Sequence, residues 1–215
     1  MPAICWLALV ACERPEPLEA PGYALDVPRS GRGPGAVTDQ EGDAHLRSGD
    51  AAPGYLDQVG GTVVPVDERT LRFVLDLAAP LPSDPALPKG DGAIGWSFCV
   101  DTDPDVAAVG FPSFESVSPC EFVLRAAWDG RKLRGFFVDR RPLMEARYSQ
   151  VQDVQPIVRN SSIELESSLE QLGYPTRFDW SITTEEFVSL NRDAVHHVDE
   201  LPEGGPSAPA TWSSK

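Results

Sequence analysis

The sequence has few lysines and histidines and no basic cluster. It contains 3 Lys and 3 His in 215 residues, and 33 Asp and Glu stand against 18 Lys and Arg, giving a net charge of −15. A chain this acidic is repelled by phosphate backbones and anionic lipid headgroups. No stripe of basic residues with interleaved aromatics occurs, so we exclude nucleic acid as a partner.

The sequence motifs typical of enzymes and of structural zinc sites are also missing. The four cysteines form no C-x-x-C pair and no cluster with histidine, which argues against zinc. No G-x-S-x-G, H-E-x-x-H, P-loop or G-x-G-x-x-G pattern is present. We therefore do not expect an enzyme. A hydrolase is the weaker alternative and needs a concave pocket with two carboxylates of perturbed pKa.

No apolar run is long enough to cross a bilayer as a helix. The longest, from Ala3 to Ala11, has the length of a signal-peptide apolar region. It ends in Leu9-Val10-Ala11-Cys12, which resembles the lipobox of bacterial lipoproteins. The resemblance implies that residues 1–12 are an export signal ending in a lipidated Cys12, anchored by two or three acyl chains. No positive charge precedes Glu13, and the alternative is a chance apolar N-terminus on a soluble protein.

Two segments contain too few apolar residues for us to expect that they fold. Residues 13–54 are rich in Pro and Gly, with Tyr23 as the one aromatic residue, and show no lasting period. Burial there cannot offset the entropy of ordering, so we predict a disordered linker between membrane and domain. Residues 201–215 predict a second disordered extension, which leaves 55–200 as the folded domain.

Period-two alternation dominates the predicted domain. Leu71, Phe73, Leu75 and Leu77 alternate with more polar neighbours, and the segment 94–100 repeats the pattern. Further strands are expected at 58–66, 120–128, 132–138, 154–158, 162–166 and 177–183. Asp129-Gly130 is typical of a two-residue type I′ hairpin turn, and Arg159-Asn160 predicts another turn. One short helix, 168–172, is expected to end at Gly173.

These elements predict a mostly β fold. We expect an antiparallel β-sandwich of about seven to nine strands with one short helix. A closed barrel is the main alternative. A parallel α/β fold would need long crossover helices, and the sequence contains no pattern that predicts them.

Cys99 and Cys120 lie at the ends of two successive predicted strands. If the chain is exported, it reaches an oxidising compartment where such a pair persists as a disulfide. By the chain-entropy model, a loop of this size gives about 3 kcal/mol of stability. The alternative is two free thiols buried in the core.

The segment between these cysteines carries alternate carboxylates at Asp101, Asp103 and Asp105. Calcium accepts six to eight oxygens in flexible geometry, so this loop is a candidate calcium site and calcium is the one cofactor we consider. The sequence departs from an EF-hand at Pro104 and Val106. The alternative is a solvated acidic turn, since Asp and Pro favour turns on their own.

Three tryptophans fall on predicted strands: Trp96, Trp128 and Trp180. Exposed on one face of a sandwich, they would form a stacking platform for sugars. The alternative is that they fill the core, because each can bury a large apolar area. His196 and His197 are adjacent and would point to opposite faces of a strand, so we do not expect them to bind one metal.

The order of features resembles the exported sandwich domains related to DOMON and family 9 carbohydrate-binding modules. The resemblance covers roughly 130 residues from Tyr55 and rests on weak, strand-like motifs, which are 55–59, 70–77, 98–103, 169–173 and 178–180. Some such domains bind sugars or haem. A haem site would require Met144 or His196 as axial ligand, and neither lies in a motif that we can match.

These observations favour an exported module of the cell envelope, anchored to a membrane through its lipid. We expect it to bind a partner, either a glycan or another envelope protein. The alternative function is an accessory or structural envelope lipoprotein that binds no small molecule. The first function requires at least two exposed aromatic side chains, and the alternative requires the three strand tryptophans to be buried.

Overall fold

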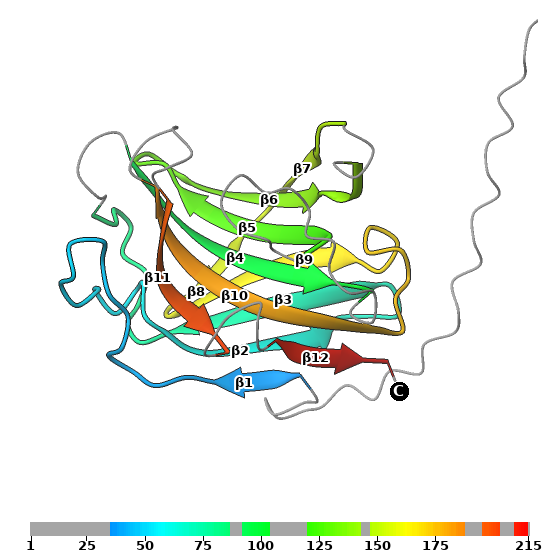
Figure 1. The fold of residues 1–215 in the computed structure, drawn as a ribbon, viewed down its shortest axis with the longest axis horizontal. Helices are drawn as coiled ribbons and strands as arrows, with labels where there is room; N and C mark the ends of the chain where they lie inside the picture. The colour runs from blue at the N-terminus through cyan, green and yellow to red at the C-terminus, as the bar shows by residue number, and fades with distance from the viewer. Residues whose placement is uncertain are drawn as a thin grey trace, which may run out of the picture.

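Strands form nearly all the regular structure of this chain (Figure 1). The structure is a computed structural model, and it describes residues 35–86, 92–103, 120–142, 147–187, 195–202 and 209–214. The strands are β1 (Ala36–Thr38), β2 (Gln58–Pro65), β3 (Thr70–Leu77), β4 (Ala93–Asp101), β5 (Phe122–Trp128), β6 (Leu133–Asp139), β7 (Gln150–Val154), β8 (Ile157–Arg159), β9 (Ser162–Ser168), β10 (Arg177–Phe187), β11 (Val195–Leu201) and β12 (Ala210–Ser213).

The strands pair antiparallel in two sheets that face each other as a sandwich (Figure 1). One sheet has five strands in the order β1-β2-β3-β9-β8. The other has seven, ordered β11-β10-β4-β5-β6-β7, with β12 also paired to β10. Because the strands form two sheets with separate edges, the predicted sandwich is confirmed and the barrel alternative is wrong.

Alternating side chains build the core between the sheets, as the period of two predicts. Leu71, Phe73, Leu75 and Leu77 of β3 are buried while the residues between them are partly exposed. From the opposite sheet, Phe98 packs its ring edge against Phe73, with 5.4 Å between the ring centroids. Aromatic contacts of this kind contribute about 1 kcal/mol beyond area burial.

Close approach of the two sheets depends on a glycine in β2. A Cβ atom on Gly61 would lie 2.6 Å from the Cδ1 of Ile182 and 3.1 Å from a methyl of Leu201. A Cβ this close would force the buried Ile182 side chain to shift, so the absence of a side chain at Gly61 lets β2 pack directly against β10 and β11. This packing brings the start of β2 near β11, which is where the candidate site described below lies.

The β5–β6 hairpin is present, but its turn is longer than predicted. Trp128 pairs with Leu133, so the turn contains the four residues Asp129 to Lys132. The Asp129 carboxylate accepts the backbone N–H groups of Arg131 and Lys132, both at 3.0 Å. Gly130 has a positive φ of 83° and Asp129 does not, which rules out a type I′ turn.

The predicted short helix is a single hydrogen-bonded turn. Ser168 and Gln171 exchange side-chain bonds with each other's backbone N–H, as in a capping box. Tyr174 N–H donates to the carbonyl of Leu169, and Gly173 has a φ of 78°, as in a Schellman motif. The predicted start and end are therefore present, but no further turn lies between them.

The boundaries of the domain predicted from the sequence are too narrow at both ends. Residues 36–38, expected in the linker, form β1 on the edge of the five-stranded sheet. In the expected tail, β12 pairs with β10, and Trp212 stacks on Phe178 with ring centroids 4.8 Å apart. Within the first segment, Ala44 is 2% exposed and belongs to the core.

One predicted strand is divided between the two sheets. We expected 154–158 as a single strand, but Val154 ends β7 in the seven-stranded sheet and Ile157 begins β8 in the five-stranded sheet. Pro156, which has no N–H to donate to a ladder, lies in the connection. This division, with β1, β11 and β12, raises the number of described strands to twelve. A turn is present between β8 and β9, but it is shifted by one residue from the prediction: Arg159 pairs with Ser162, so the turn consists of Asn160 and Ser161, with Asn160 at a φ of 56°.

Candidate functional site

The predicted disulfide is present. Cys99 lies near the end of β4 and Cys120 comes just before β5, and the two are joined with 5.2 Å between their Cα atoms. Both residues are buried. The bond closes a loop with a sequence separation of 21 residues, and so it fixes the end of β4 against the start of β5 across the outer face of the seven-stranded sheet.

The predicted calcium loop begins at this disulfide. Asp101 is the last residue of β4, and the Asp103 N–H donates to its Oδ1 at 3.1 Å. Burial raises the pKa of Asp101 to about 6, and the charges of Glu121 and Asp179 add to the effect. Asp105 lies outside the described residues. Within them, no third Asp, Glu, His or Cys lies close enough to Asp101 and Asp103 to complete a ligand set, so calcium here stays a prediction.

The three strand tryptophans lie in the core. Trp96 and Trp180 are 0% and 1% exposed, and Trp128 is 9% exposed. The Trp96 Nε1–H donates to the backbone carbonyl of Tyr55 at 3.2 Å, which fixes the ring inside the fold. None of the three offers a face on which a sugar ring can stack, so the platform that we weighed at these positions is wrong and the core alternative is confirmed.

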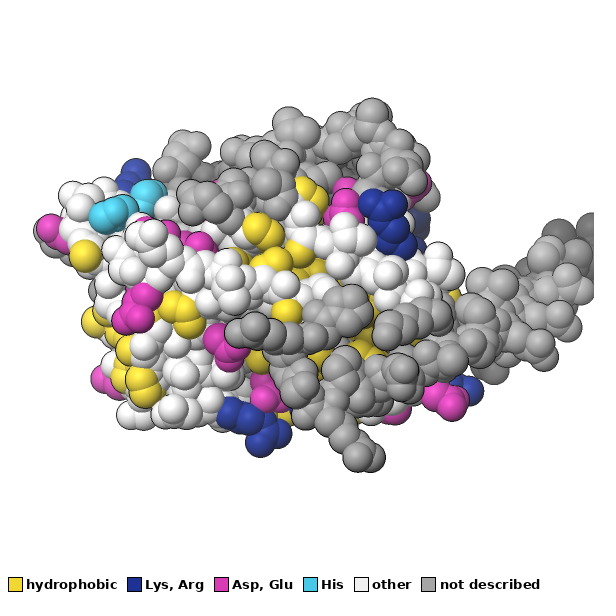
Figure 2. Space-filling model, turned by 90° about the horizontal axis from the view of Figure 1, so that it is seen from below, with side chains coloured by type: hydrophobic (Ala, Val, Ile, Leu, Met, Phe, Trp, Pro, Cys, Tyr) yellow, Lys and Arg dark blue, Asp and Glu magenta, His cyan; other side chains and the backbone are white. Residues whose placement is uncertain are grey.

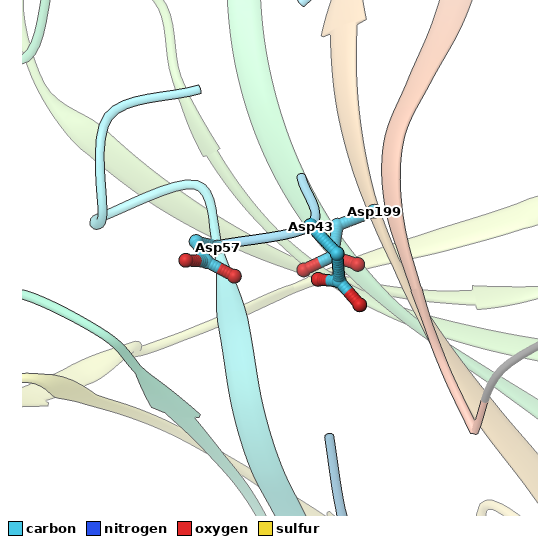
Figure 3. Close-up of side chains that lie close together, drawn as sticks. All are labelled: Asp43, Asp57 and Asp199. Carbon is cyan, nitrogen blue, oxygen red and sulfur yellow. The ribbon is translucent and has the colours of Figure 1, made fainter. Parts of the chain in front are cut away.

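A carboxylate cluster that sequence reasoning missed lies beside β11. Carboxylate oxygens of Asp43, Asp57 and Asp199 lie within 4.8 Å of one another (Figure 3). Asp43 belongs to the loop after β1, Asp57 directly precedes β2, and Asp199 lies on β11. The cluster therefore joins three segments of the chain, and its strands belong to different sheets.

Backbone hydrogen bonds place two of the three side chains of the cluster, those of Asp57 and Asp199. The chain turns at Gly42, whose φ is 92°, and the Gly42 N–H donates to the Asp57 Oδ2 at 2.8 Å. The Gln58 N–H donates to the Asp199 Oδ2 at 2.5 Å, and the Glu200 N–H donates to its Oδ1 at 2.9 Å. The loop, β2 and β11 are thus held together by bonds to the carboxylates themselves.

Two carboxylate oxygens of these residues are buried without a hydrogen-bond donor. They are the Oδ1 atoms of Asp43 and of Asp57, and the Asp57 residue is only 4% exposed. The side-chain oxygen of Gln58, next in sequence to Asp57, is also buried without a hydrogen-bond donor. Buried polar atoms in folded proteins are nearly always paired, so an orphaned carboxylate oxygen calls for a positive partner.

Negative charge gathers here without a basic side chain to balance it. Among the described residues, no Lys, Arg or His nitrogen forms an ion pair with these three carboxylates. The pKa of Asp199 is raised to about 7, chiefly by burial and also by the charges of Asp39 and Asp43, while the Gln58 N–H opposes the rise. Burial likewise raises the pKa of Asp57, with Asp43 and Glu41 adding to the effect. These are the responses of carboxylates that lack a counter-charge.

Two chemical uses fit such a cluster: binding a cation, or holding a proton for acid–base catalysis. The second would serve a hydrolase, and raised pKa values are what that alternative required. The burial of Asp57 and of Gln58, which is 0% exposed, keeps a substrate the size of a sugar away from this carboxylate. Cation binding has no such requirement, because a single ion fits between the oxygens.

Nothing in the sequence marks these three residues together. Asp43 lies in a segment that composition assigns to a disordered linker, and Asp199 follows Asp57 by 142 positions. On the face shown in Figure 2, acidic side chains are scattered rather than gathered in one patch. The only local signal is the Glu41-Gly42-Asp43 turn.

No protein-family model, no curated protein and no solved structure matches this chain. The resemblance to DOMON and family 9 carbohydrate-binding modules therefore stays a prediction, and the observed sandwich bears on the fold alone. Cys12 lies outside the described residues, so its lipidation also stays a prediction. None of the described residues belongs to a helix long and apolar enough to span a membrane.

Proposed function

We propose that this chain is an exported, lipid-anchored module of the cell envelope that acts by contacting a macromolecular partner. The observation that supports it best is the Cys99–Cys120 disulfide. Glutathione and thioredoxin keep cytosolic thiols reduced, whereas disulfides persist outside the cytosol. The apolar leader that ends at Cys12 supplies a route to that compartment.

The burial of the tryptophans bears on what the module contacts. With Trp96, Trp128 and Trp180 in the core, carbohydrate stacking loses the residues that suggested it. Burial of all three is what an accessory or structural envelope lipoprotein requires. We therefore favour a protein component of the envelope as the partner over a glycan.

Lipidation is tested by expressing the full chain with its own leader in a bacterium and analysing the product by mass spectrometry. We expect a mature chain that begins at Cys12, carries a diacylglyceryl group and enters the detergent phase on phase separation. Cys12→Ser should abolish the lipid and leave the chain in the aqueous phase. Cys5→Ser is the matched control, since it changes a cysteine within the leader and should leave anchoring intact.

An unmodified chain that retains residues 1–11 and stays in the cytosol would contradict the proposal. Thiol counting gives an independent check on the compartment. Denatured without reductant, the mature chain should expose no reactive thiol, and after reduction it should expose two, from Cys99 and Cys120.

A further inference from the structure

We propose that Asp43, Asp57 and Asp199 bind one Ca²⁺ ion. The ion would sit where the segment after β1 meets β2 of one sheet and β11 of the other. The site belongs to the sandwich itself, so the proposal stands or falls separately from export and lipid anchoring.

The spacing of the oxygens suits one calcium ion. Calcium binds oxygen at 2.3–2.6 Å, so two oxygens on the same ion lie at most about 5 Å apart. The cluster offers one oxygen from each of three carboxylates within 4.8 Å of one another. One ion can therefore contact all three side chains with at most small side-chain adjustments.

The buried oxygens without donors supply the second, independent reason. Asp57 is only 4% exposed, and its Oδ1 is buried without a hydrogen-bond partner, whereas its Oδ2 accepts the Gly42 N–H. A carboxylate oxygen removed from water in this way is strongly destabilising unless a positive charge approaches it. A divalent cation would satisfy Asp57 and Asp43 together, because both leave the Oδ1 atom without a donor.

The chemistry of the donors selects the type of ion. All three are hard carboxylate oxygens, and no histidine or cysteine takes part, which disfavours zinc and copper. Magnesium binds at 2.0–2.1 Å, which limits two oxygens to about 4 Å, and it keeps several waters in a strict octahedron. A set of carboxylates from the loop after β1, the residue before β2 and β11 suits the longer and more variable bonds of calcium.

Binding would fix the first segment of the sandwich. Without the ion, the negative charges of Asp43 and Asp57 repel each other and oppose the approach of the loop after β1 to the start of β2. With the ion, the loop after β1 gains a link to both sheets. Calcium should therefore increase the protection of backbone amides in residues 39–46 against hydrogen exchange.

The test uses the full chain, purified in detergent and stripped of metals with a chelator. We expect calorimetric titration with CaCl₂ to show one site per chain. At a Ca²⁺ concentration near 100 times Kd, the midpoint of thermal unfolding should rise by roughly 5 °C or more. MgCl₂ at the same concentration should produce a much smaller rise.

Variants locate the ion. Asp43→Asn should weaken calcium binding at least tenfold. It should also fold, since Asp43 is partly exposed and its Oδ1 makes no hydrogen bond. Asp199→Asn should have the same effect. A double variant, Asp101→Asn with Asp103→Asn, is the matched control, because it neutralises two carboxylates of the rival acidic loop and should bind calcium like the original chain. Circular dichroism would check the fold of each variant.

Several results would overturn the proposal. One is the absence of binding heat together with an unchanged midpoint in CaCl₂. Another is a calcium response that survives Asp43→Asn but disappears in the double variant, which would place the ion at Asp101. An equal response to MgCl₂ would overturn the choice of calcium.

Discussion

Two acidic clusters border β10, and they are stabilised by different means. Asp199 pairs with Thr184 of β10, and Asp101 pairs with Asp179, five positions away on the same strand. Burial raises the pKa of an aspartate in each cluster, to about 7 for Asp199 and about 6 for Asp101. By charge alone, both are candidate cation sites.

The hydrogen bonds separate the two clusters. Near Asp101, the Glu121 Oε2 accepts both the N–H and the hydroxyl of Thr102, and the Asp179 Oδ1 accepts the Thr211 hydroxyl at 2.7 Å. Near Asp199, the Oδ1 atoms of Asp43 and Asp57 have no donor. The first cluster therefore reads as an acidic turn whose carboxylates have hydrogen-bond donors. The second cluster has carboxylate oxygens without a donor, and these remain for a ligand.

The covalent support differs as well. The disulfide begins two residues before Asp101 and ends one residue before Glu121, so the backbone around the first cluster is fixed without any ion. No described disulfide reaches Asp43, Asp57 or Asp199. We infer that the repulsion between carboxylates is offset by the Cys99–Cys120 disulfide at the first cluster and by a bound calcium ion at the second.

Removal of the disulfide should produce the largest effect. Replacing Cys99 and Cys120 together by Ala should lower the free energy of unfolding by about 3 kcal/mol, because the loop is no longer closed in the unfolded chain. Urea denaturation in chelator measures it. The calcium-induced increase in stability should persist, since sites that share no partner contribute additively. Loss of that increase would show that the two clusters are coupled.

Asp43→Asn should produce a smaller effect of opposite sign. In chelator it should raise the free energy of unfolding by about 1 kcal/mol, because it removes a like charge that raises the pKa values of Asp57 and Asp199. A purely structural aspartate would instead destabilise the fold when changed. The matched control is Asp103→Asn, which removes an exposed charge beside Asp101 and should change the unfolding free energy by less than about 0.5 kcal/mol.

The difference between the clusters also shows what local sequence can and cannot predict. The strand pattern at Leu71 to Leu77 and the cysteine pair are encoded in neighbouring residues, and both were predicted correctly. The Asp101 and Asp103 carboxylates attracted attention because they alternate along the chain. In the structure the Asp101 carboxylate accepts the Asp103 N–H, and neither residue has a side-chain oxygen buried without a partner, so density of charge in sequence did not indicate unsatisfied oxygens.

The second cluster depends on contacts that no local pattern contains. Asp43 lies in a segment whose low apolar content predicts disorder, yet β1 pairs with β2 and Ala44 is buried. The low average apolar content of the C-terminal segment likewise concealed β12, in which a single aromatic residue, Trp212, provides the anchoring contact. A short edge strand needs only one or two buried side chains, and composition over a dozen residues does not reveal them.

Asp101→Asn should produce the smallest effect, visible as a change in pH dependence. Burial, with repulsion from Glu121, Asp179 and Asp103, raises the pKa of Asp101 from 3.8 to about 6. The folded state therefore retains this proton more strongly than the unfolded state. The resulting contribution to stability is complete below about pH 4 and is lost as the pH rises to about 6.

Asparagine carries no such proton and can still accept the Asp103 N–H. Stability of the variant should therefore fall less steeply between pH 4 and pH 7, by on the order of 1 kcal/mol after solvent screening. Urea denaturation at four pH values in this window measures the slope. Asp129→Asn is the control with the opposite sign, because backbone N–H groups of Lys132 and Arg131 lower the pKa of Asp129. If the unfolding free energies of Asp101→Asn and of the original chain change in parallel with pH, the pKa of Asp101 is not raised. The two clusters would then differ in electrostatics as well as in hydrogen bonding.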